Sequence, residues 1–222
     1  MKRTDCFPIP LWEDNLVGID NSEIKKFALS MQSESPNKRD ANQYRPNPTA
    51  LKWRSFYLTQ QEINSCKDIG KVIEETEVRI KTCFPVFGPN KNVDIRFDNC
   101  WFNLNEYGTY TGPHVHPASS LIATYYVAAP NGCGNIIFMN PNDSIYWNFP
   151  AGAFSQRTEY TNGLISIPAV DGKLVIAPAH FQHYVEPSQS EELRISFTMN
   201  FVMCNPNPRP NDRNFKIGRA HV

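Results

Sequence analysis

The stretch VDIRFDNCWFNL, residues 93–104, is the first of several short runs rich in Val, Ile, Phe, Tyr and Thr that continue to residue 202. Pro, Asn and Gly separate the runs, which is the pattern of β-strands joined by turns. The other runs are residues 119–130 (SSLIATYYVAAP), 134–141 (GNIIFMNP), 172–179 (GKLVIAPA), 183–187 (HYVEP) and 193–202 (LRISFTMNFV). Many short strands in one region predict a jelly-roll or β-sandwich core.

The residues before this core predict helices. Residues 21–32 carry apolar side chains at helical spacing, with Asn21 or Ser22 as the expected N-cap. Residues 59–83 form a longer pattern of the same kind, and Thr59 and Glu62 have the spacing of a capping box. The fold class is therefore mainly β with N-terminal helices (α+β), the helices packing on one sheet.

Two polar or proline-bearing segments flank the predicted helices. Residues 7–17 (FPIPLWEDNLV) predict a short strand whose prolines suit a sheet edge. Residues 33–57 predict a long loop, a kind of segment that often covers an active site. Residues 205–216 predict an irregular tail.

The length of 222 residues suits one domain with a proper core. We expect a single domain over residues 1–216, with helical support at about 20–85 and the β core at about 93–203. The last six residues, IGRAHV (217–222), resemble a translated oligonucleotide adapter, so we expect a non-native tail and set His221 aside with it.

Charge and hydropathy exclude several classes of protein. Lys plus Arg and Asp plus Glu both number 22, so a bulk basic field for nucleic acid is absent. No run approaches the 18 apolar residues of a membrane span, and the first residues lack a secretory apolar run. We expect a cytoplasmic protein. None of the six cysteines forms a C-x-x-C pair, which argues against a zinc ribbon.

Every histidine other than His221 lies in one of two short windows. These are His114-Val115-His116 and His180-Phe181-Gln182-His183. Residues i and i+2 of a strand point to one face, so His114 and His116 could bind one metal ion. His183 could add a third ligand and leave open positions for substrate and oxygen, as in non-haem iron oxygenases. The alternative is that these are hydrogen-bonded or surface histidines.

Arg194 lies downstream of the second window, in a predicted strand. Its guanidinium could bind the far carboxylate of a keto acid in a bidentate manner. Ser196 would point to the same face of that strand. The alternative for Arg194 is a salt bridge at a strand edge.

As a set, these stretches resemble the 2-oxoglutarate/Fe(II) oxygenases of bacteriophages and marine bacteria. The resemblance is carried by residues 101–127 (WFNLNEYGTYTGPHVHPASSLIATYYV), by GNIIFMNP, by GKLVIAPAHFQHYVEP and by RISFTMNF. FPIPLWEDN near the N-terminus resembles the opening segment of the same family. The resemblance covers about residues 7–202 and implies a double-stranded β-helix.

The resemblance also implies an activity and a site. It implies a prolyl-hydroxylase-like dioxygenase that uses Fe(II) and 2-oxoglutarate, hydroxylates a substrate and releases succinate and CO₂. It places the metal ligands at His114, His116 and His183. It implies that Arg194, Ser196, Tyr126 and Asn103 bind the cosubstrate.

The primary substrate, the oligomeric state and the compartment do not follow from these residues. A peptide or protein substrate is our expectation by analogy with prolyl hydroxylases, while a membrane or nucleic-acid partner is not expected. If the chain is phage-encoded, its compartment is the host cytoplasm.

The sequence departs from the common pattern of these oxygenases at one ligand. Most members carry H-x-D or H-x-E, whereas this chain has His116 where the carboxylate would stand. This leaves open whether His116 is a ligand and whether the enzyme is active. His180 is an additional histidine that we expect at the surface or outside the ligand set, and Trp101 is expected to serve in packing.

Two other interpretations remain open. A three-histidine cupin dioxygenase is suggested by the spacing of Gly108 to His114-x-His116 and of Gly172 to Pro178 and His183. A cupin does not explain Arg194, and the expected glutamate after His116 is absent. A non-catalytic jelly-roll structural protein of a phage is the second alternative.

Overall fold

The computed structural model describes residues 1–2, 8–34, 53–142, 151–158 and 160–205. Its elements, in chain order, are β1 (Trp12–Asn15), α1 (Asn21–Glu34), β2 (Trp53–Arg54), α2 (Gln60–Ser65), α3 (Lys67–Cys83), the 3-10 helix Phe84–Phe87, β3 (Asp94–Asn105), β4 (Thr111–His114), β5 (Leu121–Ala128), β6 (Ile136–Met139), the 3-10 helix Ala151–Ala153, β7 (Leu164–Ile167), β8 (Lys173–Pro178), β9 (His183–Val185) and β10 (Arg194–Cys204).

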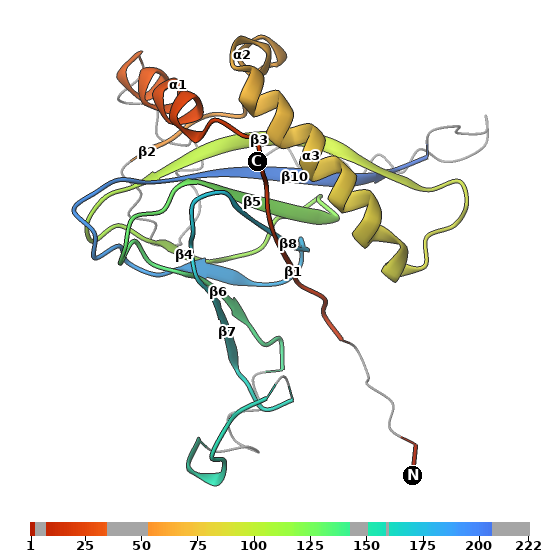
Figure 1. Ribbon diagram of the computed structural model, residues 1–222. Helices are drawn as coiled ribbons and strands as arrows, with labels where there is room; N and C mark the ends of the chain where they lie inside the picture. Colours follow the sequence, from red (N-terminus) through yellow and green to blue (C-terminus); the bar gives the residue numbers. More distant parts are fainter. Residues whose placement is uncertain (3–7, 35–52, 143–150, 159, 206–222) are drawn as a thin grey trace.

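The strands form two antiparallel sheets. The larger has six strands in the order β1-β8-β5-β10-β3-β2, and the smaller has four in the order β4-β9-β6-β7. From β4 onward the chain passes repeatedly between the two sheets, because β5, β8 and β10 belong to the larger sheet and the strands between them to the smaller. The three α-helices lie over one face of the larger sheet (Figure 1). The predicted fold class is confirmed.

Strand β10 occupies the middle of the larger sheet. It pairs with β3 on one side and β5 on the other, and its first eight residues are all buried. Ile195, Phe197, Met199 and Phe201 join the core beneath the helices. The residues that alternate with them are Arg194, Ser196, Thr198 and Asn200, which are also buried. Because side chains alternate along a strand, the polar set faces the smaller sheet.

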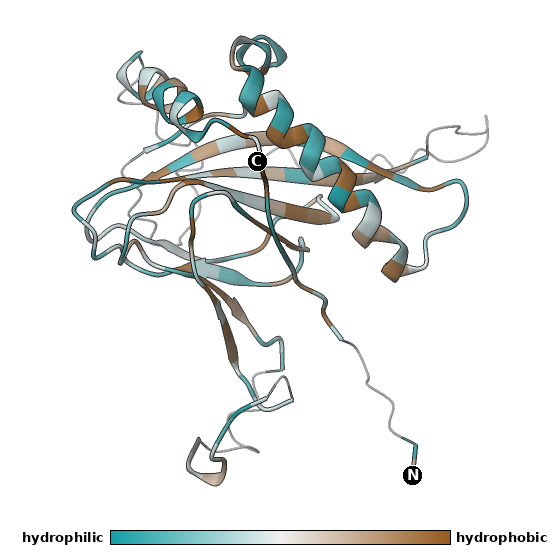
Figure 2. Ribbon diagram, in the orientation of Figure 1, coloured by the Kyte–Doolittle hydropathy of each residue, from teal (hydrophilic) through white to brown (hydrophobic). Residues whose placement is uncertain are grey.

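Two separate apolar clusters follow from this arrangement. One lies between the larger sheet and the helices, and includes Ile24 and Ala28 of α1 and Ile69, Val72 and Ile80 of α3. Accordingly, α3 carries both hydrophobic and hydrophilic stretches (Figure 2). The second cluster lies on the other face of the larger sheet, where Ile122, Tyr126 and Val175 join Phe138 of the smaller sheet.

The start of helix α1 differs in one detail from the sequence prediction. The helical face predicted for residues 21–32 is confirmed, because Ile24 and Ala28 are buried and Phe27 and Met31 pack against the same core. The expected caps Asn21 and Ser22 are wrong: the Asp20 carboxylate accepts hydrogen bonds from the backbone N–H groups of Ser22 and Glu23. Aspartate is among the preferred N-cap residues.

The predicted helix over residues 59–83 consists of two helices. Its capping box is confirmed, because Thr59 and Glu62 each bond the other's backbone N–H. The continuous helix is wrong, since Cys66 has an extended conformation (φ −128°, ψ 102°) between α2 and α3. The Ser65 hydroxyl donates to the carbonyl of Glu62. Such local bonds compete with the helical pattern and favour an end there.

Three short strands differ from the sequence prediction. β7 was not expected, and β4 ends at His114 although a strand through His116 was expected. β2 lies inside the predicted loop 33–57, where it pairs with β3. The β1 part of the predicted strand 7–17 is confirmed at a sheet edge, paired with β8. Most of the predicted loop, residues 206–216 of the predicted tail and residues 217–222 lie outside the described residues. No helix within the described ranges is long and apolar enough to cross a membrane.

Two glycines allow a matched test of this packing. Gly134 has φ +84°, and an added Cβ would lie 2.5 Å from the carbonyl oxygen of Glu186. We expect Gly134→Ala to lower the free energy of unfolding by at least about 1–3 kcal/mol, because it adds backbone strain and a clash. Gly70 lies within α3 with open space around it, so Gly70→Ala should raise that energy by about 0.5–1 kcal/mol. Urea unfolding measures both, and equal effects would contradict the described packing.

Candidate active site

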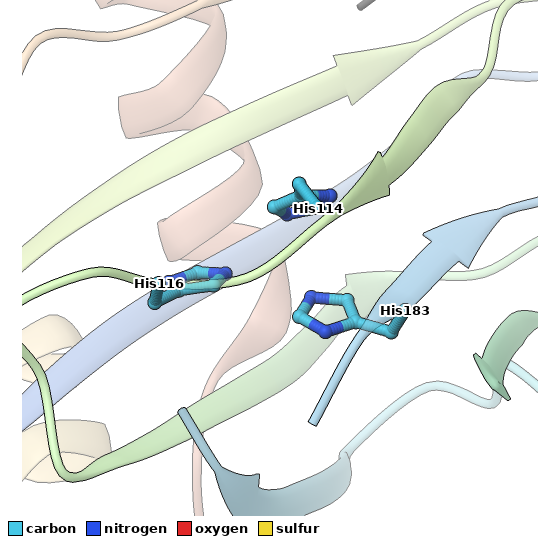
Figure 3. Close-up of side chains that lie close together, drawn as sticks. All are labelled: His114, His116 and His183. Atoms are coloured by element: carbon cyan, nitrogen blue, oxygen red, sulfur yellow. The ribbon is translucent and has the colours of Figure 1, made fainter. Parts of the chain in front are cut away.

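Three histidines from the two sequence windows converge between the sheets. One ring nitrogen each from His114, His116 and His183 lies within 4.8 Å of the other two. The ring centroids are 4.4 Å apart for His114 and His183 and 5.3 Å apart for His116 and His183. Figure 3 shows the three rings turned toward a common space. Histidines that gather in this way are the type of cluster that holds a metal ion.

Different backbone features place the three rings. His114 ends β4 and lies opposite His183 of β9, so the smaller sheet aligns this pair. His116 lies beyond the end of β4, where its backbone N–H donates to the carbonyl of Ala179. The two histidines of the H-x-H window therefore do not share one strand, as the sequence analysis assumed, yet both reach the same space.

Hydrogen bonds at Nδ1 indicate which nitrogen of each ring would bind a metal. The Nδ1 atom of His114 lies 2.9 Å from the carbonyl oxygen of Gly112, and that of His183 lies 2.9 Å from the carbonyl oxygen of Phe181. The Nδ1 atom of His116 lies 2.9 Å from the Oδ1 atom of Asn200. Each of these oxygens accepts a hydrogen bond, so each Nδ1 carries the hydrogen and Nε2 offers its lone pair.

The surroundings keep the two buried rings neutral. Burial, with the nearby His114, lowers the pKa of His183 to about 3. Burial also lowers the pKa of His116, and the other two histidines add to the effect. A neutral imidazole is the form that binds a metal ion. These two histidines can therefore bind a cation without losing protons first.

Aromatic side chains connect this site to the surface. Trp101 stacks on His116, with ring centroids 5.6 Å apart and planes 24° apart. Tyr57, which is 55% exposed, packs against Trp101, and the Arg54 guanidinium lies 4.5 Å from the Trp101 ring centroid. Trp101 thus packs, as expected, but it packs against a candidate ligand. Arg54 and Tyr57 lie in the segment predicted as a loop (residues 33–57), so neither was expected at the site.

Arg194 is a buried cation whose described hydrogen-bond partners include no carboxylate. Its side chain donates to the carbonyl oxygens of Cys133 and Gly134 and to the Oδ1 atom of Asn105. Its Nε atom is buried and has no hydrogen-bond partner among the described residues. Within the part of the chain that the structure describes, no carboxylate forms an ion pair with it. Burial lowers the pKa of Arg194.

The other predicted cosubstrate residues lie beside Arg194 on the inner face of the larger sheet. Ser196 follows it at the next inward position of β10 and pairs in register with Tyr126 on one side and Asn103 on the other. Burial raises the pKa of Tyr126 to about 12, so its hydroxyl keeps its proton and can donate. The structure therefore brings together all four residues that the sequence analysis grouped.

Further polar residues of this face were missed. Asn105 contacts Arg194, and Thr198 accepts a hydrogen bond from the Asn103 side chain. The signal was present in the sequence, because every second residue of RISFTMNF is polar. His180 is exposed, in agreement with its expected place outside the ligand set.

Comparison with known proteins identifies the class of this domain. The family model described as "Putative 2OG-Fe(II) oxygenase" matches residues 99–200. No curated protein matches the sequence.

Three solved structures share the fold. The chain superposes on a prolyl hydroxylase from Trichoplax adhaerens in complex with a hypoxia inducible factor peptide fragment, with a TM-score of 0.57, 14% identity and coverage of 86% of this chain and 83% of that one. A Pseudomonas putida prolyl-4-hydroxylase superposes with a TM-score of 0.56 and 13% identity, and the match covers 86% of this chain and 92% of that one. The viral collagen prolyl hydroxylase of Paramecium Bursaria Chlorella virus-1 superposes with a TM-score of 0.51 and 12% identity, and the match covers 86% of this chain and 94% of that one.

Residues 99–200 thus form a 2OG-Fe(II) oxygenase domain, and the protein is an oxygenase that uses Fe(II) and 2-oxoglutarate. The double-stranded β-helix expected from the resemblance is confirmed.

The residues present fit both groups. Three imidazoles with their Nδ1 atoms hydrogen-bonded offer Nε2 donors of the kind that Fe(II) accepts. The uncompensated Arg194, with its orphaned Nε atom, suits a carboxylate at the far end of a dicarboxylic keto acid.

Proposed function

We propose that the protein hydroxylates a side chain of a peptide or protein, with His114, His116 and His183 as iron ligands and Arg194 as the anchor of 2-oxoglutarate. The observation that carries this proposal is the convergence of three imidazoles on one space, together with a buried arginine on the inner face of the larger sheet that pairs with no carboxylate of the described residues. Fe(II) and 2-oxoglutarate together would activate dioxygen, one atom entering the substrate C–H bond and the other entering succinate as CO₂ is lost.

The chain's own residues would fix the cosubstrate from its far end. The Arg194 guanidinium and the Tyr126 hydroxyl are donors, and both are almost fully buried. A carboxylate there would satisfy the Nε atom of Arg194 and neutralise its charge in a water-poor site, where charge-assisted hydrogen bonds are strong. Ser196 and Asn103, in register on neighbouring strands, would line the same space.

His116 in place of a carboxylate would change the charge of the site. Three neutral ligands leave an Fe(II) centre one unit more positive than two histidines and a carboxylate do. A more positive centre attracts the dianionic 2-oxoglutarate more strongly. The neutral set is therefore compatible with the proposed cosubstrate.

The aromatic layer supports a peptide substrate. Tyr57 is half exposed and Trp101 links it to His116, so an incoming side chain could pack there next to the proposed metal. The Trichoplax adhaerens relative was solved with a peptide fragment bound, which adds support by analogy of fold.

The metal ligands can be tested with two histidines of one segment. His183→Ala should weaken Fe(II) or Co(II) binding by about two orders of magnitude or more, because affinity depends on the number of ligands. His180→Ala, three residues away and exposed, is the matched control and should bind metal like the wild type. Anaerobic titration followed by metal analysis measures both. Wild-type affinity in folded His183→Ala would contradict the assignment.

Arg194→Met tests the cosubstrate anchor and its cost to the fold. Without ligands, the free energy of unfolding should be equal to or higher than that of the wild type, because an apolar side chain of similar size replaces an unpaired buried charge. When 2-oxoglutarate is added at 100 times its Kd, the free energy of unfolding of the wild type should rise by about 2.7 kcal/mol. Arg194→Met should lose this gain, and Arg194→Lys should recover only part of it. A full gain in Arg194→Met would exclude the anchor role.

The substrate class can be tested by turnover. With peptide libraries, 2-oxoglutarate, Fe(II) and O₂, we expect succinate formation together with a peptide that gains the mass of one oxygen atom. Tyr57→Ala should raise KM for that peptide without changing 2-oxoglutarate affinity, whereas Phe87→Ala, a partly exposed control near Trp12, should change neither. Peptide-independent turnover stimulated only by a nucleobase or a small metabolite would rule out the peptide substrate.

A further inference from the structure

His116 is held differently from the other two histidines. The Nδ1 atoms of His114 and His183 each donate to a carbonyl two residues earlier in the same segment. His116 instead donates to the side chain of Asn200, which is 84 residues away on β10. Its orientation therefore depends on one side chain of the larger sheet.

The hydrogen bonds continue outward from Asn200. Its Nδ2 atom donates to the Oδ1 atom of Asn99 over 2.9 Å. The Nδ2 atom of Asn99 then donates to the Oδ2 atom of Asp98 over 2.6 Å. All three bonds run in one direction, from the imidazole to a carboxylate at the surface. Bonds aligned in this way polarise one another.

A β-bulge makes the last bond possible. In the pairing of β10 with β3, Asn200 lies opposite Asn99 while Phe201 lies opposite Phe97, so Asp98 is the extra residue. In a regular strand the side chains of residues 98 and 99 would point to opposite faces. A bulge changes the direction of side chains and occurs often beside active sites. Here it brings the carboxylate of Asp98 to the amide of Asn99.

We propose that Asn200, Asn99 and Asp98 form a positioning chain for His116, which supplies through hydrogen bonds part of the negative charge that a carboxylate ligand would bring directly. The inference rests on the proposed metal ligands. A histidine ligand whose other ring nitrogen donates to an acceptor is fixed in one tautomer and becomes a stronger donor to the metal. The Nδ1 atoms of His114 and His183 donate to the backbone carbonyls of Gly112 and Phe181 instead.

Asn200→Leu tests the positioning of His116. It should weaken Co(II) binding by about 10–100-fold and change the visible spectrum of bound Co(II), since outer partners of ligands have effects of this size. Asn131→Leu, at an exposed turn, is the matched control and should match the wild type. In the metal-free protein, ¹⁵N NMR should detect the hydrogen on Nδ1 of His116 in the wild type and a mixture of tautomers in Asn200→Leu.

Two further variants test the charge. Asp98→Asn keeps an acceptor oxygen but removes the charge, so it should shift the Co(II) spectrum with a smaller loss of affinity than Asn200→Leu. Asn200→Asp keeps the shape of the side chain and adds a negative charge next to His116. It should therefore shift the Co(II) spectrum in the direction opposite to Asp98→Asn. This variant remains informative if Asn200→Leu does not fold. Spectra unchanged in both variants would overturn the proposal, as would wild-type affinity and tautomer in Asn200→Leu. A wild type that binds no Co(II) would contradict the proposed metal site itself. A wild type that binds Co(II), with variants that behave like it, would contradict only the positioning chain.

Discussion

The burial of β10 on both faces is the constraint on which the rest of the structure depends. One face carries Ile195, Phe197 and Met199 against the helices, and this apolar contact holds the two layers together. The other face has to present buried polar side chains to the smaller sheet. Buried polar groups need partners. Asn103 supplies one for Thr198, and Asn105 supplies one for Arg194.

The positive charge of Arg194 is not neutralised by the described residues that accept its hydrogen bonds. Three neutral oxygen atoms accept its hydrogen bonds, but none of them cancels the charge. Burying such a cation lowers the stability of the fold, but it also creates a site that attracts an anion. Burial also keeps His116 and His183 neutral. The polar interior is therefore suited to a divalent cation and a dianion that enter together, and each would offset the cost of burying the other.

Much of this could be predicted from the sequence, because the strongest signals were local. The period of two in residues 193–202 and the helical period in 59–83 depend only on neighbouring residues, and both define elements of the fold. The clustering of His114 and His183 required long-range pairing of β4 with β9, which the resemblance supplied. The break at Cys66 and the bulge at Asp98 were not predictable in this way, because competing hydrogen bonds and tertiary pairing decide them.

The central claim is that the three histidines and Arg194 form one site for iron and 2-oxoglutarate. Anaerobic addition of 2-oxoglutarate to the Fe(II)-loaded wild-type protein, followed by visible absorption, tests it most directly. We predict a weak charge-transfer band that appears only when both are present and that saturates at one cosubstrate per iron. Iron binding with no band, or a spectrum indifferent to 2-oxoglutarate, would contradict the claim.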